Sequence, residues 1–201
     1  MRRPQITTQR FAEIFGEMVS SRRLFAEDWE FFKMTRVLEL LFEEDEGNEW
    51  KLKTFRSLDA EPRGAVVALD GKVTLTVDER LLERAEKGQT LANFILAHEI
   101  AGHIGLDHHA TGALTKHFKL IDGPKGKSNI PKNVEELEAD YAGVIFQCGV
   151  ALMDSTMDPV RLAHLAYSDV STVKLVQKLV QLEVFKAELA RQTKPRERVV
   201  L

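Results

Sequence analysis

The sequence predicts an α+β fold that is mostly helical, with a small, mainly antiparallel sheet of three strands. Three observations point to this class. Apolar residues recur at helical spacing near both ends of the 201-residue chain. Between these ends, residues 50–77 alternate apolar and polar side chains, as half-buried strands do. Asp70-Gly71 separates the last two alternating runs, and this pair is a strong hairpin signal.

We expect a single domain, residues 1–201, in three parts: a helical segment (1–48), a core (49–155) and C-terminal helices (156–201). In the first part, apolar spacing predicts helices over residues 8–20 and 27–43. In the core, the strands are expected at residues 53–58, 65–69 and 72–77.

The core continues with helical signals. Asp78 starts a helix that runs to about residue 87, and Gly88 ends it. Thr90 is then expected to cap the next helix. In the C-terminal part, Asp158 starts a helix to about residue 167, and a second is expected from residue 168 or 171 to about 192.

The composition is that of an ordinary globular protein. Hydrophobic residues make up 44% and charged residues 29%, which argues against a disordered or fibrous chain. The net charge of −3 gives no basic field, so we expect no direct binding of nucleic acid. No run approaches the ~18 apolar residues of a membrane span, and Arg2-Arg3 lacks the apolar run of a secretory signal. We therefore expect a cytoplasmic protein with no membrane partner.

Cys148 is the single cysteine, so the sequence allows no internal disulfide. Its neighbours Val144, Ile145, Phe146 and Val150 are apolar. A reactive cysteine needs an electropositive, partly exposed setting, so we expect Cys148 to be buried and inert.

The most informative motif is HEIAGH at residues 98–103. Neutral imidazole is the commonest protein ligand for zinc, and a glutamate after the first histidine is where zinc hydrolases keep their base. Here three residues separate Glu99 from His103, whereas the usual motif has two. On an α-helix His98 and His103 would point about 140° apart. A π-type turn realigns such a pair, so we predict one between them, with Gly102 where distortion costs least.

The second motif is EELEADYA at residues 135–142. On a helix Glu136 and Asp140 share one face, while Glu135 and Glu138 lie at other angles. Zinc held by two histidines and one glutamate keeps a fourth position for water, so we expect Glu136 to be the third ligand. Asp140 would accept a hydrogen bond that orients a ligating imidazole. The alternative is a solvated acidic first turn favoured by the helix dipole.

Together with LANFILAHE at residues 91–99, these motifs resemble the ImmA/IrrE family of small zinc metallopeptidases, over roughly residues 60–155. In that family the phrases have the form Phe-Thr-Leu-Ala-His-Glu-x-Gly-His and Glu-x-x-Ala-Asn-x-Phe-Ala. This chain departs by one inserted residue and by Asp140 and Tyr141. The resemblance implies a zincin-like fold with the sheet beside the metal-binding helix, Zn²⁺ as cofactor, and Glu99 as general base and proton shuttle.

The resemblance also implies a protein substrate, often a DNA-binding repressor. In zinc peptidases a sheet edge beside the zinc helix commonly holds substrate as an added strand, and the sequence does not reveal which edge is free. Dipeptidyl peptidase III is similar at two points. It has the longer His-Glu-x-x-x-His spacing, and a Glu-Glu-x-x-Ala-Glu segment whose second glutamate binds zinc, as we expect of Glu136.

Residues 105–133 show no sustained period and are expected to form a mobile active-site loop. Tyr141, His108, His109 and His117 are candidates to donate a hydrogen bond to the oxyanion of the tetrahedral intermediate. His108 and His109 are also rival metal ligands.

Three interpretations of function remain open from the sequence. The first is a zinc peptidase. The second is a regulatory or partner-binding protein whose zinc is structural, with His108 or His109 as a fourth ligand. The third is a helical interaction module without metal. The apolar stripe over residues 175–185 could complete the core or form a homodimer contact.

Overall fold

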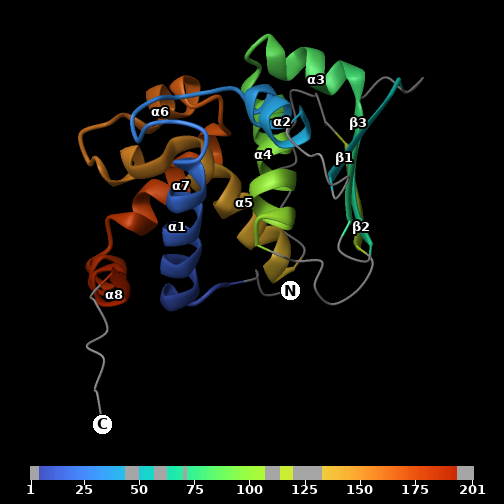
Figure 1. The fold of residues 1–201 in the computed structure, drawn as a ribbon. Coiled ribbons are helices and arrows are strands. Elements are labelled where there is room, and N and C mark those ends of the chain that lie inside the picture. Colours follow the sequence, from blue (N-terminus) through green and yellow to red (C-terminus); the bar gives the residue numbers. More distant parts are fainter. Residues whose placement is uncertain are drawn as a thin grey trace.

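The computed structural model describes residues 5–43, 50–56, 63–69, 72–106, 114–119 and 133–193. Its fold is α+β and mostly helical, as predicted. Figure 1 shows the helices gathered to one side, with the sheet standing beside α3 and α4. The helices are α1 (Thr8–Arg22), α2 (Met34–Glu43), α3 (Glu79–Glu86), α4 (Thr90–Ala97), the π-helix η1 (His98–Ile104), α5 (Val134–Cys148), the 3-10 helix η2 (Gly149–Met153), α6 (Pro159–Leu165), α7 (Val170–Val180) and α8 (Glu183–Thr193).

The described part of the sheet has four strands in the order β1-β3-β2-β4, so the prediction of three strands is wrong. The strands are β1 (Trp50–Phe55), β2 (Arg63–Leu69), β3 (Lys72–Asp78) and β4 (Leu114–Lys119). β1 pairs with β3 in parallel, whereas β2 pairs antiparallel with both β3 and β4. With two antiparallel pairs and one parallel pair, the described sheet is mixed.

The unpredicted strand, β4, lies in the segment that the sequence suggested was a loop. It forms because it pairs with the backbone of β2, with Gly64 opposite Phe118 and Ala68 opposite Leu114. The predicted hairpin is confirmed by the pairing of Leu69 with Lys72, although Asp70 and Gly71 lie outside the described residues. β2 also contacts η1, so the sheet lies beside the helix that carries the histidine motif.

The first two helices differ in how well the sequence placed them. α1 begins where expected, after Thr7, whose hydroxyl accepts a hydrogen bond from the Arg10 amide. α2 begins only at Met34, so its predicted start at residue 27 is wrong. The Met34 amide donates to Asn93 Oδ1 at 2.7 Å, and this contact from α4 fixes the start of α2.

Further along the chain, α3 is capped by Asp78 and followed by Gly88 as predicted. Thr90 is not a cap: Gln89 holds that position in α4 and makes no side-chain cap bond. Asp158 caps α6 as expected. The helix predicted to run to about residue 192 is broken into α7, which Asp169 caps at its start, and α8, because the chain turns after Val180.

The core is built around α5, which packs against α1, α4, η1 and α7. Cys148, at its end, is fully buried, and burial raises the pKa of its thiol to about 12. The predicted burial of Cys148 is therefore confirmed. Among the helices that the structure describes, none has both the length and the apolar character needed to cross a membrane.

Candidate metal centre

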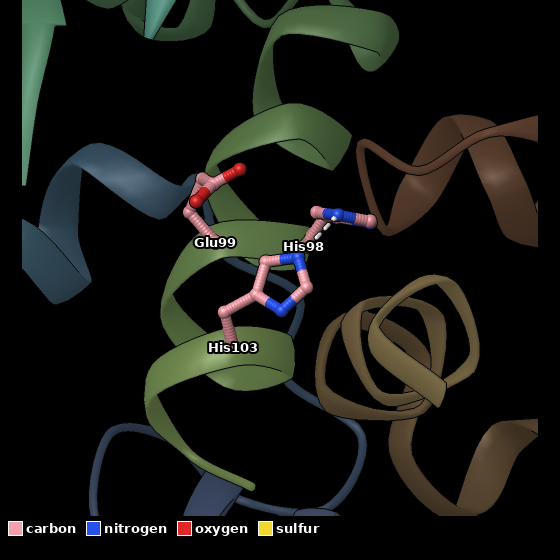
Figure 2. Close-up of side chains that lie close together, drawn as sticks. All are labelled: His98, Glu99 and His103. Atoms are coloured by element: carbon pink, nitrogen blue, oxygen red, sulfur yellow. Dashed lines mark hydrogen bonds between the residues drawn. The ribbon is translucent and has the colours of Figure 1, made fainter. Parts of the chain in front are cut away.

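The histidine motif lies in a π-helix, as the spacing of its residues predicts. α4 passes directly into η1, which begins at His98, and the Gly105 amide donates to the Ile100 carbonyl five residues earlier, at 2.8 Å. This wider turn places His98 and His103 on the same side of the helix (Figure 2), with their Nε2 atoms 3.1 Å apart. Both imidazoles are buried.

The second motif meets this pair from α5. Asn133 caps α5 by accepting a hydrogen bond from the Glu136 amide at 2.9 Å, which sets Glu136 in the first turn. Glu136 Oε2 lies 3.5 Å from His98 Nε2, and Oε1 lies 3.7 Å from His103 Nε2. One turn later, Asp140 Oδ1 accepts from His98 Nδ1 at 2.8 Å. The structure therefore brings together His98, His103, Glu136 and Asp140, four of the side chains that the two motifs predicted.

The pKa values of His98 and Asp140 are both raised within this cluster. Burial opposes protonation of His98, but hydrogen bonds to Asp140 and Glu136 outweigh it and raise the pKa of the imidazole to about 9. Burial also raises the pKa of Asp140, against the opposing effect of its bond to His98. The cluster thus attracts a proton or another cation into a buried position.

The geometry fits a divalent cation. Tetrahedral bonds of about 2.0–2.1 Å place ligand atoms roughly 3.3 Å apart. The two Nε2 atoms lie 3.1 Å apart, and Glu136 lies 3.5 Å from His98 Nε2 through Oε2 and 3.7 Å from His103 Nε2 through Oε1, so these distances are close to that value. Two Nε2 atoms that face each other at hydrogen-bond distance also need a proton or a cation between them. Two imidazoles and one carboxylate are a donor set that zinc prefers.

Glu99 is the remaining acidic side chain of the cluster. It is buried, and one of its carboxylate oxygens lies within 4.8 Å of a ring nitrogen of both His98 and His103. Glu136 approaches the two histidines with a different oxygen each, at 3.5 Å from His98 Nε2 and 3.7 Å from His103 Nε2. One carboxylate from η1 and one from α5 therefore lie near the two imidazoles.

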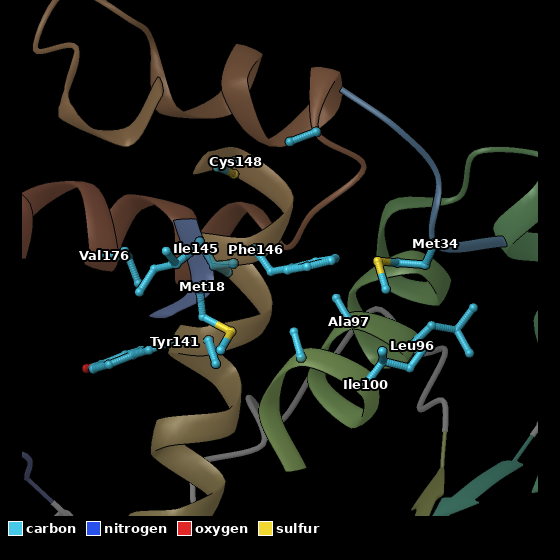
Figure 3. Close-up of a cluster of buried hydrophobic side chains, with 14 of the residues drawn as sticks. Met18, Met34, Leu96, Ala97, Ile100, Tyr141, Ile145, Phe146, Cys148 and Val176 are labelled. Atoms are coloured by element: carbon cyan, nitrogen blue, oxygen red, sulfur yellow. The ribbon is translucent and has the colours of Figure 1, made fainter. Parts of the chain in front are cut away.

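Of the other residues predicted for the site, Tyr141 is not brought to it. Tyr141 lies on the far side of α5, as Figure 3 shows, and its ring packs edge-on against Phe11 with 5.5 Å between centroids. We therefore drop Tyr141 as an oxyanion donor, since packing accounts for its position. His117 lies in β4 opposite Ala65. His108 and His109 lie outside the described residues.

Two residues that position the second motif were missed from the sequence. Asn133 stands three residues before Glu136, which is the spacing of a capping residue, so this signal was present. Arg10 donates to both carboxylate oxygens of Glu138 at 3.2 and 2.9 Å and ties α1 to α5. No local pattern could have indicated a pair that is 128 residues apart.

None of the protein-family models, curated proteins or solved structures compared with the chain matches it. The likeness to the ImmA/IrrE family therefore rests on the residues of the two motifs.

Proposed function

We propose that this chain is a zinc-dependent metallopeptidase of zincin-like architecture, with His98, His103 and Glu136 as the metal ligands. The observation that carries the proposal is the π-turn of η1, which compensates for the unusual spacing and turns His98 and His103 toward Glu136. Two buried imidazoles converge here with a carboxylate from another helix. This arrangement supports the metal centre rather than the alternative, a solvated acidic first turn of α5.

Each side chain of the cluster then has a definite task. Zinc, when bound there, would supply the Lewis acidity that polarises a peptide carbonyl and makes water acidic. Glu99 would take the proton of the attacking water and pass it to the leaving nitrogen. Asp140 would hold His98 in one orientation through the bond to Nδ1. Burial of Glu99 keeps its carboxylate from being screened by bulk water.

The proposed substrate is an exposed segment of a partner protein. The motif resemblance suggests a transcriptional repressor, cut in the cytoplasm without direct contact between this chain and nucleic acid.

A homodimer is also proposed through Leu175, Leu182 and Val184, the members of the C-terminal stripe that remain 45%, 49% and 62% exposed. Sedimentation of the wild type and of Val184→Lys would test this contact. The wild type should sediment as a dimer and the variant as a monomer.

One observation favours a second candidate, a non-catalytic zinc-binding regulator. Because Glu99 lies within 4.8 Å of both histidines, it could close the metal site as a fourth ligand. A closed site would hold zinc for structure and leave no position for water.

The variant Glu99→Gln separates the two functions. If Glu99 is the base, the variant keeps its zinc, loses cleavage and traps substrate, since a positioned base commonly contributes about 10²–10⁴-fold. Mass spectrometry of lysates treated with wild type or variant would then reveal new peptide termini that need Glu99. If Glu99 is a ligand, the variant loses zinc as His103→Ala does. Equal partner capture by both forms with no cleavage at saturating zinc would refute the peptidase.

A further inference from the structure

We propose that Gly102 and Gly143 are positioning residues of the metal centre: they let η1 and α5 cross closely enough for Glu136 and Asp140 to reach His98. The inference rests on the proposed metal site, and it explains how two separate helices are brought to the same point. At this crossing, a Cβ atom on Gly102 would meet Ala139 of α5, and a Cβ atom on Gly143 would meet the backbone of Ala97 and His98.

Gly102 is in contact with the backbone of α5. A Cβ atom there would lie 2.6 Å from both Cα and Cβ of Ala139, and 2.9 Å from the Ala139 carbonyl oxygen. Real Cβ atoms do not approach other atoms so closely, so even alanine would push the helices apart. Ala139 directly precedes Asp140, and a shift there moves the carboxylate that holds His98. Gly102 therefore has a second task besides easing the π-turn.

Gly143 makes the reciprocal contact from α5. A Cβ atom there would lie 3.0 Å from the His98 amide nitrogen, 3.2 Å from the Ala97 carbonyl carbon and 3.3 Å from His98 Cα. These atoms belong to the backbone of the proposed ligand His98 and of the residue before it. Gly143 shares a helix face with Asp140 and Glu136, so both carboxylates and the contact lie along one line of α5.

The two contacts leave little freedom to accommodate a side chain. At Gly143 the neighbours are backbone atoms, which cannot rotate away as a flexible side chain can. A displacement of a few tenths of an ångström would lengthen the 2.8 Å bond between His98 Nδ1 and Asp140 Oδ1 to about 3.1–3.2 Å, the long end of the hydrogen-bond range, and so weaken it. Gly102, with the shorter distances, should tolerate alanine less well than Gly143.

The chain provides two matched controls. Gly16 lies in α1, and a Cβ there would meet nothing within 4 Å, so Gly16→Ala makes the same chemical change without a new contact. Phe185 is buried in α8 against Phe11 and Phe15. Phe185→Leu should destabilise the fold at a distance from η1, which controls for a loss of zinc through unfolding alone.

The test has two parts. Chelator competition measures the zinc affinity of each variant, at a temperature below the unfolding temperature of all of them. Crystal structures of the metal-free wild type and of metal-free Gly143→Ala give the distance between His98 and Asp140. We expect Gly143→Ala to weaken zinc binding about 10–100-fold, as loss of a supporting contact does, and Gly102→Ala to weaken it at least as much. Gly16→Ala and Phe185→Leu should bind zinc as the wild type does. In metal-free Gly143→Ala, the distance between Asp140 Oδ1 and His98 Nδ1 should be a few tenths of an ångström longer than the 2.8 Å of the wild type.

Wild-type affinity in Gly143→Ala, or an unchanged distance between His98 and Asp140 in its structure, would overturn the inference. A wild type without zinc would instead refute the proposed function, and the two metal-free structures would still decide whether Gly143 positions Asp140. If Phe185→Leu lost as much affinity as Gly143→Ala, general stability would explain the result and the inference would fail.

Discussion

Zinc binding to this chain should depend steeply on pH, because a proton and the metal compete for His98. The pKa of His98 is raised to about 9, so at pH 7 nearly all of the metal-free protein carries a proton on this imidazole. Displacing that proton at pH 7 costs about two pKa units, or roughly 2.7 kcal/mol, which weakens zinc binding by about 100-fold. Raising the pH removes the competing proton, so the apparent Kd should fall about tenfold per pH unit from 7 to 9 and then level off.

The assay is competition against a chelator of known pH dependence, performed at half-unit steps from pH 6.5 to 9.5. Asp140→Asn is the matched control, since it keeps the size of the side chain and an oxygen acceptor but removes the charge. The pKa of His98 should then fall, and the plateau of zinc affinity should begin at lower pH. A wild-type affinity that does not change between pH 7 and 9 would refute the reasoning. So would identical profiles for wild type and Asp140→Asn.

Three further outcomes follow from the same contacts. His98→Ala, His103→Ala and Glu136→Ala should each remove most of the zinc from the purified protein by metal analysis, and full occupancy in His103→Ala would contradict the ligand set. Asp140→Ala should retain zinc with an affinity about 10–100-fold weaker, since it only orients His98. Cys148 should resist alkylation in the folded protein at pH 8 and react once denatured, because its thiol is buried with a pKa of about 12; rapid labelling of the native chain would count against this.

The cluster of His98, His103, Glu136 and Asp140 was largely predictable from the sequence, because metal-site chemistry constrains the directions of a few side chains. Two ligating imidazoles must face one point, so the spacing of His98 and His103 required a π-turn, which the structure contains. Helical geometry likewise placed Glu136 and Asp140 on one face of α5. The same geometry puts Tyr141 about 100° from Asp140, which already separates it from the site.

The features that the sequence did not predict depend on contacts between distant segments. β4 forms because β2, about fifty residues earlier, offers it a ladder, and no alternation within residues 114–119 signals that pairing. α2 starts at Met34 because a side chain of α4 accepts a hydrogen bond from its amide. The apolar residues before Met34 mimic a helical period, yet Phe32 packs on Phe146 from a non-helical segment.

The π-turn has a consequence for how such sites are recognised in other sequences. One additional residue in an α-helix normally rotates everything after it by about 100°, which would turn the following apolar face out of the core. Here the additional residue is accommodated within η1, and Ile104 and Leu106 after it are still buried. A search pattern that fixes two residues between glutamate and histidine would pass over this chain. A criterion based on the direction in which the two imidazoles point would include it, whatever the number of residues between them.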